Sequence, residues 1–209
     1  MNNTNSPSPL IVDLLLAEYP HKRCALDYNS PFELLVASRL SAQCTDARVN
    51  IVSAILFKRY KTIEDYATAD IIEMEKLVYS CGFYHIKARD IIEAAQMVKE
   101  KGFPKTMDEM LLIPGIGRKI ANLLMGEIYE KNDVIIADTH CIRLSNRLGY
   151  CKTKDAGKVE IELKNQILPE NQFEFSHALV THGRAICKAA NPSCSQCIVE
   201  KYCIKAEVK

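Results

Sequence analysis

The feature that most constrains the fold of this chain is a five-residue stretch near its middle, residues 113–117, with the sequence IPGIG. Pro114 lacks a backbone N–H, and the two glycines permit positive φ angles, so the stretch cannot continue a helix. Apolar residues lie on both sides of it, which predicts two helices joined by a hairpin. The second helix should begin at about Arg118, where free backbone N–H groups and two cationic side chains would attract phosphate.

The remainder of the chain also shows helical patterns. Apolar residues recur at helical spacing between capping residues, prolines and glycines. They predict helices over residues 10–19, 31–42, 63–67, 69–80, 86–101, 108–112, 118–129, 139–148, 155–168 and 173–187, and a further helix capped by Thr45 or Asp46. The only β-branched run, residues 134–136, is too short for a sheet. We therefore expect an all-α fold.

The composition limits the classes of protein that this chain can belong to. Hydrophobic residues make up 48% of the 209 residues and charged residues 25%, which is ordinary for a globular protein. No apolar run approaches the ~20 residues that span a bilayer, and the first residues do not resemble a signal peptide. We expect a cytoplasmic protein without a membrane partner, associated with the nucleoid if it is bacterial. The net charge is only +1, so nucleic-acid binding would depend on where basic groups lie.

Four of the nine cysteines are close together near the end of the chain, in the pattern C-x6-C-x2-C-x5-C. They are Cys187, Cys194, Cys197 and Cys203. Without a secretory signal a disulfide framework is not expected, and clustered thiolates need a metal. Both Zn²⁺ and a [4Fe–4S] cluster accept four thiolates, so the chemistry of the ligands leaves both open. Because Asn191 and Pro192 interrupt any helix between the cysteines, the metal would fix a loop.

Lys119 and Asp138 are the candidate catalytic pair. The positive end of a helix disfavours another cation, so Lys119 at this position needs an anionic partner or a chemical role. An amine that attacks carbon must be unprotonated, which suits a Schiff-base nucleophile. Asp138 precedes the helix expected from Thr139, and it would also serve as the N-cap of that helix.

The residues of the hairpin resemble the helix-hairpin-helix DNA-binding motif LPGxGxK, and the match to the endonuclease III family is close. That family's signature is represented here by Leu112, Pro114, Gly115, Gly117, Arg118, Lys119, Ala121 and Asn122, followed by Asp138, Thr139 and His140. The cysteine spacing is also the spacing of this family, which favours [4Fe–4S] over zinc. The resemblance extends from about residue 10 to Cys203.

The resemblance implies a fold of two lobes with a discontinuous boundary. One lobe is a six-helix barrel over residues 24–131, and the other combines residues 1–23 with residues 132–209 and holds the cluster. The implied activity is that of a bifunctional DNA glycosylase with AP lyase activity. In it, Lys119 is the nucleophile and Asp138 the essential carboxylate. The implied partner is double-stranded DNA containing oxidised pyrimidines or abasic sites, and the protein would act as a monomer.

The same resemblance implies residues that contact DNA. The segment LSAQCTD, residues 40–46, is similar to the family's turn that carries a glutamine inserted into the vacated base stack, which is Gln43 here. Phe83 lies where the family usually has a leucine wedge, and His85 replaces a more usual asparagine. Ser41 and His140 are candidates for lining the base pocket.

The hairpin itself is implied to dock on the DNA backbone through Gly115, Gly117 and Arg118. Close approach and positive φ are expected at both glycines. The carbonyls of Leu111, Ile113 and Ile116 would hold a monovalent cation against phosphate, in the manner of the family. Lys87 and Arg89 are interpreted either as DNA backbone contacts or as part of an exposed helix face.

Two other functions remain open at this point. A monofunctional glycosylase for mismatches or other lesions would share the cysteine spacing, but adenine-mismatch glycosylases lack the lysine found here at position 119 and carry an extra C-terminal domain. A non-enzymatic iron–sulfur redox module would use the hairpin only for docking. Borohydride trapping on abasic DNA separates the enzyme from the docking module, because only a Schiff-base enzyme becomes covalently linked.

Overall fold

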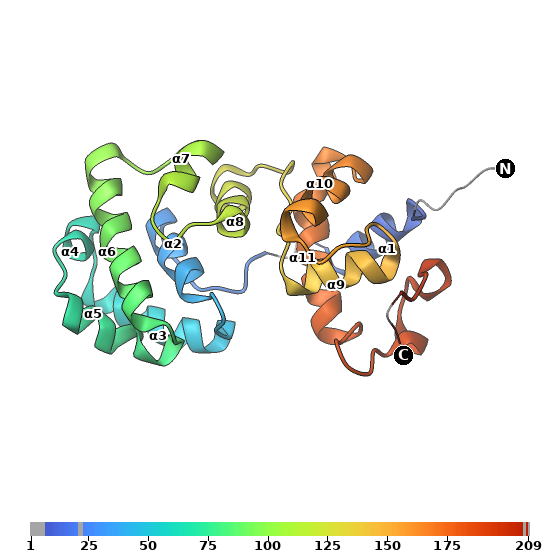
Figure 1. Ribbon diagram of the computed structural model, residues 1–209, viewed down its shortest axis with the longest axis horizontal. Helices are drawn as coiled ribbons and strands as arrows, with labels where there is room; N and C mark the ends of the chain where they lie inside the picture. The colour runs from blue at the N-terminus through green and yellow to red at the C-terminus, as the bar shows by residue number, and fades with distance from the viewer. Residues whose placement is uncertain (1–6, 21–22, 207, 209) are drawn as a thin grey trace. The chain divides into compact units, whose positions relative to one another are not determined.

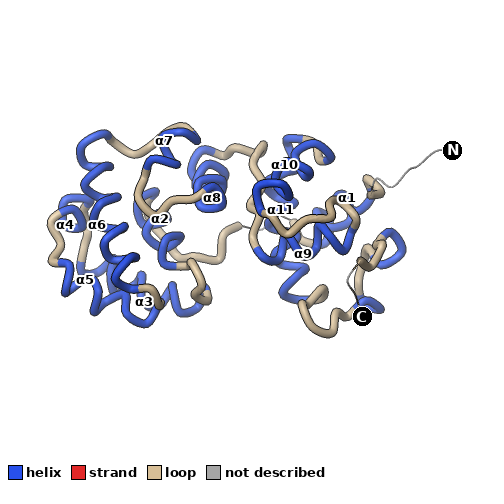
Figure 2. Tube along the Cα trace, in the orientation of Figure 1, coloured by secondary structure: helices blue, strands red, loops and turns tan. Residues whose placement is uncertain are grey.

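The computed structural model describes residues 7–20, 23–206 and 208, and all regular secondary structure among them is helical (Figures 1 and 2). The predicted all-α class is therefore confirmed. The chain divides into two compact units. One contains Ala25–Tyr129, and the other contains the described residues up to Cys24 together with those from Glu130 onward. None of the described helices is long and apolar enough to cross a membrane.

The unit Ala25–Tyr129 is built around the long helix α6. Its helices are α2 (Pro31–Leu40), α3 (Asp46–Arg59), α4 (Ile63–Ala67), α5 (Ile71–Val78), the 3₁₀ helix η1 (Tyr79–Cys81), α6 (Tyr84–Lys101), α7 (Met107–Leu112) and α8 (Arg118–Tyr129). Helix α6 packs against α2, α4 and α5, while α2 also packs against α3 and α8. The buried core includes Leu34, Leu35, Leu56, Met74, Ile91 and Leu124.

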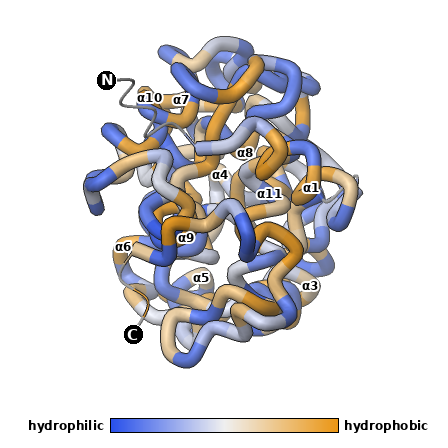
Figure 3. The backbone as a smooth tube through the Cα atoms, turned by 90° about the vertical axis from the view of Figure 1, so that its right-hand side faces the viewer, coloured by the Kyte–Doolittle hydropathy of each residue, from blue (hydrophilic) through white to orange (hydrophobic). Residues whose placement is uncertain are grey.

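The second unit joins the first helix of the chain to its last helices. It contains α1 (Leu10–Glu18), α9 (Thr139–Leu148), α10 (Ala156–Gln166), α11 (Pro169–Ala185) and the 3₁₀ helices η2 (Cys194–Gln196) and η3 (Glu200–Tyr202). Both α1 and α9 pack against α11, and their shared core includes Ile11, Leu15, Ile135, Leu144, Phe175 and Leu179. Hydrophobic stretches alternate with hydrophilic ones along the chain, as expected of helices buried on one side (Figure 3).

Side-chain caps fix where many of these helices begin. Each capping oxygen accepts a backbone N–H from the first turn, which would otherwise lack a partner. The caps are Ser30, Thr45, Thr62, Asp70, Thr106, Asp138 and Asp155. Three predicted starts are wrong by two residues or more. Helix α6 begins at Tyr84 instead of residue 86. Helix α5 begins after Asp70 instead of at residue 69, and α11 begins at Pro169 instead of residue 173, because proline is favoured at the first helical position.

Candidate functional site

The predicted hairpin lies between α7 and α8. Ile113 and Ile116 are only 4% and 6% exposed, so they anchor the turn in the core of its unit. The Ile116 N–H donates to the Ile113 carbonyl at 3.1 Å, and the Ala121 N–H donates to the Gly117 carbonyl at 3.0 Å, which opens α8. The turn therefore presents the first backbone N–H groups of α8 outward.

The two glycines of the hairpin differ in backbone conformation and in the space around them. Gly115 has φ +74° and lies against the ion pair of Arg39 and Asp90, so a Cβ there would come within 2.5 Å of Asp90 Oδ2. Gly117 has no positive φ, and a Cβ on it would meet nothing within 4 Å. The expectation of positive φ at both glycines is therefore wrong for Gly117, which directly precedes the first residue of α8.

The ion pair beneath the hairpin joins α2 to α6. Arg39 Nε donates to Asp90 Oδ2 at 2.7 Å, and Arg39 Nη2 lies 2.7 Å from the same oxygen. The two side chains are 13% and 8% exposed. Nothing in the sequence predicts this pair, because the two residues are 51 positions apart and neither lies in a motif that marks it.

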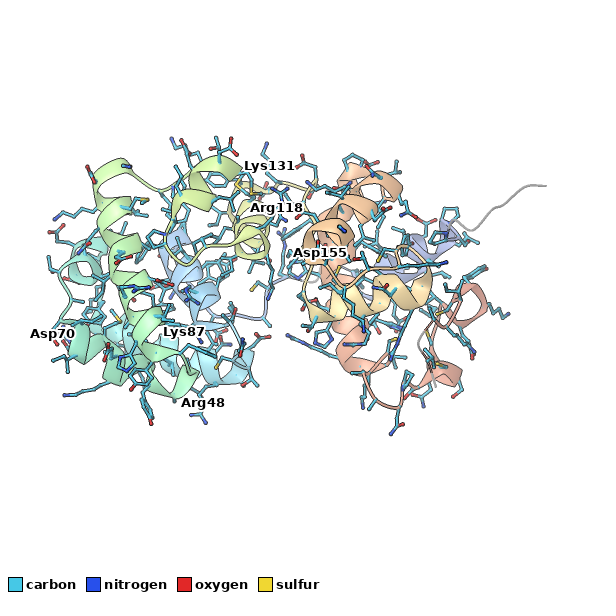
Figure 4. The ribbon with its side chains drawn as sticks, viewed as in Figure 1. Arg48, Asp70, Lys87, Arg118, Lys131 and Asp155 are labelled. Carbon is cyan, nitrogen blue, oxygen red and sulfur yellow. The ribbon has the colours of Figure 1, made fainter. Side chains whose placement is uncertain are left out.

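Lys119 is exposed and lies in the first turn of α8, directly after the hairpin. Arg118, which Figure 4 labels, precedes it at the start of the same helix and is also exposed. Two cationic side chains and the positive end of the helix dipole thus gather at one end of α8. This arrangement can bind an anion and leaves the Lys119 amine accessible to a reactant.

Asp138 is half-buried and caps α9, since its Oδ1 accepts the Cys141 N–H at 2.7 Å. The capping role considered from the sequence is therefore present. His140 follows in the first turn of α9, and its Nδ1 lies 3.2 Å from Arg143 Nη2. Burial, together with the nearby arginines, lowers the pKa of His140 below its usual value, although Asp138 opposes the shift. The lowered pKa favours the neutral imidazole, which can both donate and accept a hydrogen bond.

Two exposed turns carry the residues expected to enter DNA. Gln43 lies just beyond the end of α2 and Phe83 just before α6, and both have left-handed backbones, with φ 53° and 48°. Phe83 is 59% exposed. Such conformations are unfavourable for residues other than glycine and persist only where the surroundings hold them. Ser41, the C-cap of α2, donates its hydroxyl to the Ser38 carbonyl at 2.8 Å.

Lys87 differs from the sequence interpretation. It has no exposed surface, so both suggested roles, DNA backbone contact and exposed helix face, are wrong for it, whereas Arg89 is exposed. The helical spacing of the sequence does indicate that Lys87 is buried. Lys87 lies four residues before Ile91 and so shares its helical stripe, which continues through Ala94 to the buried face of α6.

The four clustered cysteines line one pocket beside Arg147 and His182. Three of their sulfurs lie next to nitrogen donors. Arg147 Nη1 lies 3.3 Å from Cys187 Sγ, His182 Nε2 lies 3.3 Å from Cys197 Sγ, and the Lys205 N–H lies 3.4 Å from Cys203 Sγ. In the described part of the chain, no group of three or more His, Cys, Asp or Glu side chains is arranged to hold a single metal ion.

Two arginines give an independent indication of what the pocket accepts. Arg147 is buried and donates to the carbonyls of Lys188 and Ala189 at 2.7 and 2.9 Å, and Arg143 donates to the Cys187 carbonyl at 2.9 Å. Among the described residues neither forms an ion pair with a carboxylate. A buried guanidinium is costly without a compensating anion. An anionic cluster held by four thiolates would supply one, so the residues present fit such a group.

The hairpin, with its adjoining helices, defines a class of DNA repair protein. The HhH-GPD superfamily of base excision DNA repair proteins matches residues 36–169. Endonuclease III of Synechocystis sp. is 39% identical over 201 residues, which is 94% of this chain and 91% of that protein.

Solved structures of endonuclease III also resemble this chain over nearly its whole length. A non-covalent endonuclease III–DNA complex matches with a TM-score of 0.88 and 37% identity, covering 94% of this chain and 93% of that one. A trapped covalent endonuclease III–DNA intermediate matches with a TM-score of 0.87 and 38% identity, covering 93% and 92%. The chain belongs to the endonuclease III family. That family consists of DNA glycosylases with AP lyase activity.

Proposed function

We propose that this protein excises damaged pyrimidines from duplex DNA and then nicks the strand through a Schiff base on Lys119. The observation that carries the proposal is an exposed lysine in the first turn of α8, directly after a hairpin that presents backbone N–H groups. The hairpin would bind the DNA phosphate, and the amine would meet the sugar of the extruded nucleotide.

The proposed reaction starts with the loss of the base. As the glycosidic bond breaks, C1′ gains positive charge, which the Asp138 carboxylate stabilises. The Lys119 amine forms a bond to C1′ as the base departs with the electron pair of the glycosidic bond and takes up a proton. Once the new C1′–N bond has lost a proton from nitrogen, the C1′–O4′ bond breaks, so that the sugar ring opens, O4′ becomes a hydroxyl and C1′ is held as an iminium. The resulting iminium makes the C2′ proton acidic, so its removal forms a C1′–C2′–C3′ conjugated system as the C3′–O bond to phosphate breaks. Water then hydrolyses the imine and releases Lys119.

Direct evidence for this function would come from borohydride trapping of the wild-type protein on duplexes with one thymine glycol or one abasic site. A covalent complex that increases with borohydride, together with strand cleavage, is the expected result. DNA binding without any covalent product would instead favour an iron–sulfur docking module. Base release with neither trapping nor nicking would favour a monofunctional glycosylase.

We further propose that the hairpin and the two exposed turns contact DNA. Gly115, Gly117 and Arg118 would contact the phosphate backbone, while Gln43 and Phe83 would fill the space left by the extruded base. Ser41 and His140 would line the base pocket. The carbonyls of Leu111, Ile113 and Ile116 are proposed ligands of a monovalent cation beside the phosphate.

Cys187, Cys194, Cys197 and Cys203 are the proposed ligands of the [4Fe–4S] cluster. When bound, the cluster ties together four points of a loop that has little helical structure of its own. The chain's residues contribute the thiolates, the hydrogen bonds to sulfur and the positive charge of Arg143 and Arg147. Hydrogen bonds and charge around the sulfurs would set the stability of each cluster charge state.

We expect protein purified without oxygen to be brown, with one [4Fe–4S] cluster per chain. Cys197→Ser should lose most of the iron and lower the unfolding midpoint, because a ligand that fixes the loop is removed. The measurements are iron and zinc content, the visible spectrum and thermal unfolding. Cys44→Ser, at another half-buried thiol outside the four, is the matched control and should keep the colour. A colourless protein containing stoichiometric zinc would contradict the cluster assignment.

The hairpin glycines give a second prediction, in which stability and DNA affinity separate. Gly115→Ala should lower the free energy of unfolding by roughly 1–3 kcal/mol, from the left-handed backbone and from displacement of the Arg39–Asp90 pair. Gly117→Ala should leave the free energy of unfolding unchanged, because the added methyl group meets nothing within 4 Å. It should still weaken binding to duplexes of any sequence, since it obstructs the phosphate.

Thermal unfolding and fluorescence anisotropy with an uncleavable abasic-site analogue measure the two effects. Gly117→Ala with wild-type affinity would show that DNA does not approach the hairpin at this residue. Gly115→Ala with wild-type stability would show that the ion pair can move aside without cost.

A further inference from the structure

Lys87 is a fully buried lysine whose ammonium group has only backbone partners. It lies near the start of α6, where Figure 4 labels it, and it has no exposed surface. Its Nζ donates to the carbonyls of Leu40 and Ala42 at 2.8 Å each and to the carbonyl of Cys81 at 2.7 Å. An ammonium has three N–H groups, so all of them are used.

The buried charge is compensated by the ends of two helices. Leu40 ends α2 and Cys81 ends η1, so the ammonium faces carbonyls at helix C-termini, where the helix dipole is negative. No ion pair of Lys87 with a carboxylate is found among the described residues. Burial lowers the pKa of Lys87, which shows that its environment is costly for a charge. A buried ion of this kind fixes its partners, because breaking any one contact leaves a charged group unsatisfied.

The three carbonyls lie at or directly before the start of the two turns that carry Gln43 and Phe83. The Ala42 carbonyl is part of the peptide bond that leads into Gln43. The Cys81 carbonyl leads into Gly82, which has φ 70° and is followed by Phe83. Both turns hold left-handed residues with exposed side chains, and Lys87 is the common group that holds the backbone immediately before each.

We propose that Lys87 is a positioning residue that fixes the Gln43 and Phe83 turns relative to each other before DNA binds. Both side chains can then enter the duplex together without a loop first becoming ordered. The inference rests on the proposed function, which assigns insertion into DNA to these two residues. Lys87 is not itself a nucleophile, since it has no exposed surface and no unused N–H.

The test is a mutant cycle on strand cleavage at a preformed abasic site in duplex DNA, under single-turnover conditions with saturating enzyme. Lys87→Met alone should slow cleavage by roughly tenfold to a hundredfold, because the two turns lose their common anchor. In a Gln43→Ala/Phe83→Ala background the same substitution should cost about twofold or less, since the side chains it positions are absent.

Equal losses in both backgrounds would overturn the proposal, because a general destabilisation acts regardless of Gln43 and Phe83. Lys99→Met is the matched control, since Lys99 is an exposed lysine of the same helix, paired with Glu64. It should cleave at the wild-type rate. Absence of cleavage by the wild-type protein would count against the proposed function and would be seen before any variant is compared.

Hydrogen exchange of the wild-type protein tests the same idea if Lys87→Met does not fold. The Cys44 N–H donates to the Ser41 carbonyl at 3.1 Å, and the Gly82 N–H donates to the Tyr79 carbonyl at 3.2 Å. Both amides should exchange slowly in the DNA-free protein, and DNA should add little protection. Fast exchange in the free protein that becomes slow only with DNA would show that the turns are ordered by DNA, contrary to the proposal.

Discussion

Lys119→Gln should abolish borohydride trapping and slow strand cleavage by on the order of a thousandfold or more, while binding to lesion-containing duplex persists. Glutamine keeps a polar side chain, one carbon shorter than that of lysine, but its amide nitrogen is not nucleophilic, so the imine cannot form. The measurement is single-turnover cleavage of a thymine-glycol duplex, with trapping followed on a denaturing gel. Wild-type cleavage by this variant would show that the nucleophile lies elsewhere.

Arg118→Gln provides the matched control for the charge that Lys119→Gln removes. It deletes the neighbouring cation in the same exposed turn of α8 but leaves the amine in place. We expect weaker DNA binding and undiminished trapping once the enzyme is saturating. Loss of trapping by both variants to the same extent would mean that the charge of the turn matters more than the amine.

Asp138→Asn should slow base release by roughly a hundredfold to a thousandfold, because the neutral amide cannot stabilise the positive charge that develops at C1′. The fold should be preserved, since asparagine caps a helix about as well as aspartate and can still accept the Cys141 N–H. Base release from a thymine-glycol duplex, measured by alkaline cleavage of the resulting abasic site, gives the rate, and thermal unfolding reports on the cap.

Asp155→Asn is the control that distinguishes the helix-capping role of Asp138 from its proposed role in base release. Asp155 caps α10 in the same way, with its Oδ1 accepting the Lys158 N–H at 2.8 Å. This variant makes the same chemical change at a cap, and we expect base release at the wild-type rate. Comparable slowing in both variants would assign the effect to helix capping and would remove Asp138 from the mechanism.

Much of the fold could be predicted because its signals are local. The hairpin follows from the proline and glycines of residues 113–117, and the bounds of α8 and α9 agree with the spacing of apolar residues and with the Asp138 cap. Caps and helix breakers act within three or four residues of where they stand. The predicted first residue of a helix is wrong where two neighbouring residues can each cap it, as at the start of α5. It is also wrong where the first turn of the helix is polar, as in α11 after Pro169.

The environment of the site was harder to predict, because it depends on contacts between distant residues. A lysine on an amphipathic helix is usually exposed, which predicts a surface position for Lys87, whereas its spacing places it among residues that are buried. The three carbonyls that hold it belong to two other segments of the chain. The Arg39–Asp90 pair under Gly115 likewise appears only once α2 and α6 are packed together.

Helix α1 shares its core with α9 and α11, whereas Ala25–Tyr129 forms a unit of its own. During synthesis, the ribosome therefore releases α1 long before its partners exist, and the intervening unit can fold first. Until α11 emerges, the apolar side chains of Ile11 and Leu15 have no native surface to cover them. A helix that is translated before the unit Ala25–Tyr129 is thus among the last to reach its native contacts.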